Sequence, residues 1–197
     1  MAEAISGDAG LAARARSLML TPRVAWAEIA AEAAPPRRIF TGYVLILAAI
    51  NPIAFTIGRL VFGGRALGAV YRVPVLAALI EGVVGYGLAL GSVWALAFLI
   101  EGLAPPCGAV KDRAASFRIA AYASTAGWLA SVFYLVPDLG VLALIGQLYT
   151  LWLLYLGVKI LLQPRGRTLG YVALVVVCYV VLMMLVISLT KLLTALA

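Results

Sequence analysis

The chain has 197 residues, of which 65% are hydrophobic and only 12% are charged, and its formal net charge is +7. A soluble domain is about 45–50% apolar and about 25% charged, and it cannot hide this much apolar surface from water. The composition therefore excludes an ordinary soluble domain and requires a lipid environment.

Residues 1–10 are rich in small residues and are predicted to be disordered. The segment 11–36 follows, and its Thr21-Pro22 pair favours the start of a helix at the proline. Trp26 shares a face of this helix with other apolar residues, and tryptophan suits the headgroup level of a membrane. We expect 11–36 to be an amphipathic segment on the cytoplasmic leaflet, and packing of the same face on the protein itself is the alternative.

Long apolar runs that are nearly free of charge occupy the rest of the chain, at 40–62, 75–100, 117–136, 139–161 and 169–190. Each has about 20 residues or more, the length that a helix needs to cross a hydrocarbon core about 30 Å thick. The backbone must satisfy its own hydrogen bonds in lipid, and these runs do not alternate as barrel strands do. The sequence therefore predicts an all-α, polytopic integral membrane protein with five transmembrane helices within 37–197.

The positive charges indicate the orientation. With five spans, the N-terminus and the second and fourth loops share one side, which carries eleven of the fifteen lysines and arginines. The positive-inside rule then places the N-terminus in the cytoplasm and the C-terminus outside, in the cell inner (plasma) membrane. Arg37 and Arg38, together with Trp26, are predicted to anchor the chain at the interface. We expect the basic side to attract anionic headgroups and not nucleic acid.

Asn51 and Pro52 lie in the middle of the first span. Proline removes a backbone hydrogen bond to the carbonyl of Ala48, so a kink is predicted there. Asn51 is available to bond the weakened backbone or a neighbouring helix.

The second span carries a carboxylate, Glu81, in an otherwise apolar stretch. Residue counting places it about 10 Å inside the outer boundary, at a depth similar to those of Arg59, Gln147 and Ser131. These residues are candidates for a polar layer in the outer half of the membrane. Two interpretations remain open: an Arg59–Glu81 ion pair that fixes two helices, or a cavity in which Glu81 changes protonation or binds a cation.

Gly87 and Gly91 form a G-x-x-x-G pair in the second span. Such pairs allow close helix approach, either within one chain or between two copies. Self-association through these glycines, or binding of other membrane proteins, is therefore a candidate interaction.

Nothing in the sequence indicates catalysis. There is no histidine, no G-x-S-x-G nucleophile elbow and no phosphate-binding glycine loop. The two cysteines cannot complete a zinc site by themselves. We therefore predict no catalytic residue, no cofactor and no metal site.

Three stretches together resemble the Yip-domain family, the Ypt-interacting proteins: LMLTPRVAWAEI, AAYASTAGWLASVF and LYTLWLLYLGVKILLQPRGRTLGYV. The resemblance covers about residues 12 to 190 and implies five spans with a cytoplasmic N-terminus. Eukaryotic members are linked to Rab-type GTPases, but the acidic D-L-Y-G-P signature of those members is missing here. The alanine- and arginine-rich composition favours the bacterial branch.

Two functions are consistent with these features. The first is a membrane-organising or adaptor protein that acts through helix packing, the 11–36 segment and the basic loops. The second is a small transporter or channel for an ion or solute, which uses the polar layer around Glu81. A continuous wet path to Glu81 favours transport, and a paired Glu81 favours the organising role.

Overall fold

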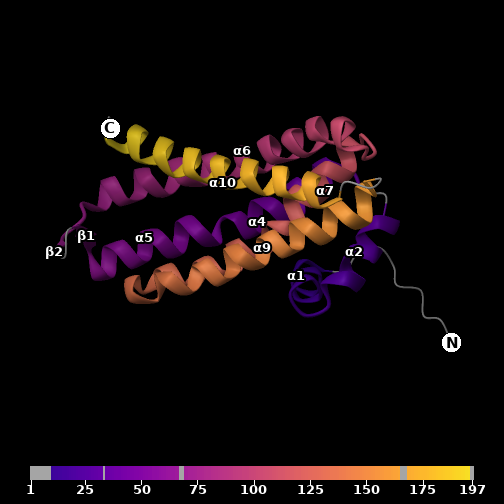
Figure 1. Cartoon of the computed structure of the whole chain (residues 1–197). Coiled ribbons are helices and arrows are strands. Elements are labelled where there is room, and N and C mark those ends of the chain that lie inside the picture. Colours follow the sequence, from indigo (N-terminus) through magenta and orange to yellow (C-terminus); the bar gives the residue numbers. More distant parts are fainter. Residues whose placement is uncertain (1–9, 33, 67–68, 165–167, 196–197) are drawn as a thin grey trace.

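The computed structural model describes residues 10–32, 34–66, 69–164 and 168–195 (Figure 1). These residues are helical apart from connecting segments and one short β-hairpin, so the predicted all-α class is confirmed. Disorder is expected for residues 1–10, and residues 1–9 of this segment lie outside the described residues.

Four helices in the described part of the chain are long and apolar enough to cross a membrane: Pro36–Phe62, Val75–Leu103, Pro137–Leu162 and Leu169–Thr194. They correspond to four of the five expected spans, each longer than its apolar run. The elements that form them are α3 (Pro36–Ile39), η1 (Phe40–Val44), α4 (Leu45–Ala48), α5 (Ile50–Phe62), α6 (Val75–Leu103), η4 (Pro137–Leu142), α9 (Ala143–Gly157), η5 (Val158–Leu162) and α10 (Thr168–Ala195). The chain is therefore a multi-pass membrane protein.

The expected third span is helical but differs from the others. It consists of α7 (Arg113–Ala123), α8 (Thr125–Ala130) and η3 (Ser131–Leu135), with an interruption at Ser124. Every residue from 115 to 123 except Arg118 is buried, because small side chains let the neighbouring helices close around it. Figure 1 places the N-terminal helices and the C-terminus at opposite ends of the bundle, an arrangement that five passes would produce and four would not. Membrane crossing by this inner segment stays a prediction.

The connections lie at the two ends of the bundle. At one end β1 (Gly64–Ala66) pairs antiparallel with β2 (Ala69–Tyr71) and joins α5 to α6. At the same end only Val136 separates η3 from η4, so this connection is a tight turn. At the other end η2 (Pro105–Cys107) leads from α6 towards α7.

The first span is interrupted where the sequence predicts a kink. Helical hydrogen bonding breaks at Ala49, between α4 and α5, one turn before Pro52. Proline has no N–H to offer to the carbonyl of Ala48, so the helix cannot continue there without a defect. The predicted break is confirmed.

The segment 11–36 forms a helical hairpin of α1 (Leu11–Leu20) and α2 (Pro22–Ala31) that packs on the bundle. Trp26 is completely buried, and its ring lies against Tyr122 at a centroid distance of 6.5 Å. The face of α2 that carries Trp26 therefore packs on the protein itself, which was the alternative to packing on lipid. Trp26 is not available at the headgroup level as an interface anchor, because the bundle surrounds its ring, whereas Arg37 and Arg38 are exposed.

Close helix approach occurs at glycines other than the predicted pair. Gly87 and Gly91 are exposed, and a Cβ atom added to either would meet nothing within 4 Å. The expectation that they pack within the chain is therefore wrong, because this face of α6 points away from the bundle. A Cβ on Gly146 would lie 2.1 Å from the Cβ of Ala130, so α8 and α9 touch there instead.

Candidate functional site

A cavity of about 490 Å³ lies among α5, α6, α8, α9 and α10. It extends along α6 from Glu81, near the β-hairpin end, to Ser92. Its polar lining consists of Asn51, Glu81, Ser92, Ser124, Tyr134, Gln147, Tyr179, Thr190 and Lys191. Of the predicted polar layer, Glu81 and Gln147 line this cavity, whereas Arg59 and Ser131 are not among its lining residues.

The predicted ion pair is present. Arg59 on α5 pairs with Glu81 on α6, and the two side chains are 22% and 17% exposed. Arg59 also lies 5.4 Å from the ring centre of Phe55 and donates to the hydroxyl of Tyr71 at 3.4 Å. The helices can meet here because Gly82 has no side chain: a Cβ there would stand 2.5 Å from the hydroxyl of Thr56. The pair thus joins α5 to α6.

The other predicted residues have separate roles. Gln147 on α9 accepts a hydrogen bond from the hydroxyl of Tyr179 on α10 at 2.6 Å, and its amide lies over Gly127 on α8. Asn51 lines the cavity, and no hydrogen bond of its side chain to another described residue is found. Ser131 does not join this group, because it is buried and donates to the carbonyl of Trp128 at 2.5 Å.

The serine and threonine hydroxyls of the cavity bond to carbonyls of the preceding helical turn. Ser92 donates to Ala89 at 2.7 Å, and Ser124 donates to Ala120 at 2.8 Å. Such back-bonding to the preceding turn satisfies a hydroxyl without a ligand. These hydroxyls make the cavity polar, but their hydrogen bonds are already formed within the protein, so they need no bound ion.

The cavity is closed towards the end that carries α1 and α2. Beyond Ser92 the next turns of α6 contribute the buried side chains of Val93, Leu96 and Ile100. Opposite them α7 contributes Phe117 and further buried residues. A packed apolar core does not conduct ions or water. In this conformation packed apolar side chains therefore separate the cavity from the end that carries α1 and α2.

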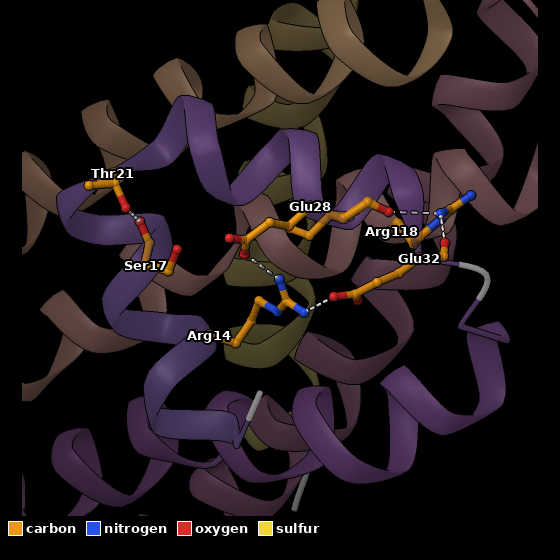
Figure 2. A network of polar contacts seen from close by, with 7 residues as sticks. Arg14, Ser17, Thr21, Glu28, Glu32 and Arg118 are labelled. Atoms are coloured by element: carbon orange, nitrogen blue, oxygen red, sulfur yellow. Dashed lines mark hydrogen bonds and ion pairs between the residues drawn. The ribbon is translucent and has the colours of Figure 1, made fainter. Parts of the chain in front are cut away.

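A second polar cluster holds the α1–α2 hairpin closed, and Figure 2 shows it. Arg14 on α1 is only 6% exposed and forms ion pairs with Glu28, at 3.4 Å, and with Glu32. Arg118 on α7 donates to the carbonyl of Ile29 at 2.9 Å and to that of Glu32, at the carboxyl end of α2. A buried charge must be paired, so this cluster, which we call the hairpin clasp, locks α1 and α2 to each other and to the bundle.

The sequence alone does not reveal the hairpin clasp. Arg14 and Arg118 count among the positive charges that indicate the topology, although each has partners on another helix. Glu28 and Glu32 are four residues apart and so share one helical face, which was the available signal. Among the described residues, no group of three or more His, Cys, Asp and Glu side chains is placed to hold a metal ion.

Comparison with known proteins gives a family but no close relative. The family model of the Yip1 domain matches residues 16–188, which is most of the chain. This match confirms the resemblance seen in the sequence. No curated protein and no solved structure matches.

Proposed function

The chain belongs to the Yip1 domain family, and we propose that it is a membrane-organising or adaptor protein without catalytic activity. The observation that carries this proposal is the position of the α1–α2 hairpin. The hairpin packs on the side of a membrane-spanning helix and does not lie beyond its end (Figure 1).

Two contacts locate the hairpin along the span Pro137–Leu162. Trp26 packs on Gly157, where a Cβ atom would come within 2.9 Å of the indole ring. The hydroxyl of Tyr149 donates to the carbonyl of Met19 at 3.0 Å. At 1.5 Å per residue, Gly157 and Tyr149 lie about 8 and 20 Å from the helix end at Leu162. The 26-residue span is about 39 Å long, so a hydrocarbon core of about 30 Å leaves about 4–5 Å of helix outside it at each end. The two contacts then lie about 3 and 15 Å inside the core, which is the depth of one leaflet.

The outer face of the hairpin is suited to lipid. Leu20 and Val24 are 67% and 56% exposed, and Arg16 and Arg23 are exposed beside them. Apolar side chains flanked by long cations are typical of helices that lie in a membrane interface, because the cations reach back to the headgroups. Since the hairpin clasp holds this element in place, the protein adds volume to one leaflet only.

We infer that this leaflet is the cytoplasmic one of the inner membrane, with the C-terminus outside, since the basic loops follow the positive-inside rule. Anionic headgroups are the expected partners of the basic end, and nucleic acid is not. Cys107 lies at that end, in η2. A membrane-impermeant maleimide should label it only after cells are permeabilised, whereas Arg72→Cys in a Cys107→Ser background should react on intact cells. The reverse pattern would invert the orientation.

The depth of the hairpin is tested with an environment-sensitive label at Leu20→Cys, in a Cys107→Ser, Cys178→Ala background. In bilayers, lipids with a spin label near the headgroup should quench this label strongly, and iodide in the water should quench it weakly. A label at Pro105→Cys, an exposed residue beyond the end of α6, is the control and should respond to iodide. Equal iodide quenching at both positions would exclude insertion of the hairpin.

The organising role requires one further readout. Vesicles reconstituted with the wild-type protein should be smaller than vesicles that hold the Leu20→Glu, Val24→Glu double variant at the same protein-to-lipid ratio. A hairpin that adds volume to one leaflet favours membrane curvature, and the two glutamates should keep it out of the lipid. Circular dichroism shows whether both proteins are folded. If they are and the two vesicle size distributions are equal, the organising role is refuted. Partner proteins and self-association through Gly87 and Gly91 belong to the same proposal, since those exposed glycines leave a helix face open.

A small-solute transporter is the second candidate, and the cavity beside Glu81 favours it. It requires the apolar barrier beyond Ser92 to open. Fluxes of protons, cations and small solutes are measured in proteoliposomes that hold the wild type or a Glu81→Gln variant. Equal fluxes for the two proteins would exclude transport of those species. Flux that Glu81→Gln abolishes would replace the organising role with transport.

A further inference from the structure

A second pocket lies at the opposite end of α6 from Glu81, at the level where the spans end. It has a volume of about 240 Å³ and is lined by Pro36, Trp94, Phe98, Glu101, Arg113 and Phe117, among others. Pro36 begins the first span, Leu103 ends α6 and Arg113 begins α7. The pocket therefore lies at headgroup depth, and we call it the interfacial pocket.

The wall of the interfacial pocket is aromatic. The rings of Trp94 and Phe117 lie 4.4 Å apart, and Phe40 packs on Trp94 at 5.8 Å. Phe98 is 50% exposed, and the guanidinium of Arg113 stands 4.8 Å from its ring centre. Aromatic faces carry negative potential and attract cations, so a ligand ammonium has a favourable surface here.

Two opposite charges border this wall. Glu101 on α6 and Arg113 on α7 both line the pocket, yet neither forms an ion pair with the other or with any further residue that the structure describes. A carboxylate beside aromatic rings suits an ammonium group, and an arginine suits a phosphate, which it can bind through two parallel hydrogen bonds. The pocket is thus complementary to a molecule that carries both groups a few atoms apart.

The surface of α6 continues from the pocket towards the middle of the membrane. Gly87, Gly91, Trp94, Phe98 and Glu101 follow one another at spacings of four, three, four and three residues, so they lie on one face of the helix. Gly87 and Gly91 are exposed, and nothing lies within 4 Å of where their Cβ atoms would be. The missing side chains leave open positions along α6 beyond the pocket, and we call this strip of the helix surface the track.

From these features we propose that the interfacial pocket binds an aminophospholipid, a lipid whose headgroup holds both a phosphate and an ammonium. Its ammonium lies between Glu101 and the rings of Trp94 and Phe98, and its phosphate lies on Arg113. One acyl chain follows the track over Gly91 and Gly87. This site contains no residue of α1 or α2 and does not depend on insertion of that hairpin into one leaflet. A lipid chain over Gly91 and Gly87 and self-association through the same glycines exclude each other.

The test compares two lipids with identical acyl chains, phosphatidylethanolamine and phosphatidylglycerol, on the full-length protein by native mass spectrometry. The wild type should retain the ethanolamine lipid about tenfold better, because only that headgroup offers a cation to Glu101 and the rings. Glu101→Gln should remove the preference and keep residual binding of both lipids. Arg113→Gln should weaken both lipids, because both carry the phosphate.

Matched controls separate this site from general lipid contact. Arg72→Gln, at the other end of α6, should change neither lipid, and Gly91→Leu, which fills the track, should weaken both. Equal retention of the two lipids by the wild type would overturn the proposal. A preference for the glycerol lipid would do the same, because it would show a merely basic surface.

A photoreactive ethanolamine lipid gives a second measurement that needs no variant. Its crosslinks in bilayers of the wild-type protein should map to residues 87–103 of α6 and the start of α7. Crosslinks that map mainly to α10 would contradict the proposed position of the lipid.

Discussion

The Arg59–Glu81 pair allows a quantitative test of what the polar residues inside the bundle do. Replacing either residue by glutamine leaves one charge without its partner in a low-dielectric environment. Breaking a buried ion pair costs about 3–5 kcal/mol, whereas an exposed pair contributes about 0.2–1 kcal/mol. Both side chains are about one-fifth exposed, at 22% and 17%. We therefore expect each single variant to lose about 2 kcal/mol of unfolding free energy, between these limits.

The double variant distinguishes a clasp from two independent sites. With both charges removed no unpaired ion remains, so Arg59→Gln, Glu81→Gln should also lose about 2 kcal/mol and not the sum of the two singles. The coupling energy is then about 2 kcal/mol, above the average of about 0.6 kcal/mol for hydrogen bonds between membrane helices, because full charges are involved.

The assay is reversible unfolding of the purified protein in mixed micelles, followed by circular dichroism as the denaturing detergent is increased. Glu101→Gln is the matched control: it lies on the same helix, makes no ion pair with the described residues, and should leave stability unchanged. Coupling below about 0.5 kcal/mol would mean that the pair does not fix α5 against α6. Glu81 would then have no structural role in holding these two helices together.

Other contacts give further predictions in the same unfolding assay. Trp26→Ala should cost about 3–5 kcal/mol because it empties a fully buried site, whereas Trp26→Phe should cost about 1 kcal/mol or less, since the buried indole N–H has no hydrogen-bond partner among the described residues. Gly146→Leu should cost about 3 kcal/mol through overpacking against α8, and Gly87→Leu, in open space, should stay within about 0.5 kcal/mol. Arg14→Ala should open the hairpin clasp and speed tryptic cleavage after Arg23, with cleavage at the wild-type rate arguing against the clasp.

Some of this structure follows directly from sequence because it depends on local chemistry. Apolar runs determine where helices cross lipid, and Pro52 determines where one of them breaks. The Arg59–Glu81 pair is predictable for a related reason. Two consecutive spans must run antiparallel, so counting residues from their common loop gives the depth of both side chains, and a charge at that depth requires a partner.

Features that depend on helix rotation are not predictable in this way. Gly87 and Gly91 have the spacing of a packing motif, but spacing does not say which way that face of α6 points. Trp26 has the composition of an interface anchor, and only its contact with Gly157, more than a hundred residues away, places it in the core. Likewise Arg14 resembles a topology signal until folding brings α2 beside it.

The distribution of paired and unpaired charges gives the strongest indication of where this protein recognises other molecules. In the half of the bundle nearest the β-hairpin, the side chains of Arg59, Glu81 and Gln147 are bound to groups on neighbouring helices. At the end that carries the hairpin, Glu101 and Arg113 border an aromatic pocket and form no ion pair with the described residues. A charged side chain that stabilises a fold is paired with another group of the protein, whereas one that binds a ligand has no partner within the protein. We therefore expect substitutions around the cavity to change stability, and substitutions around the interfacial pocket to change lipid binding at constant stability.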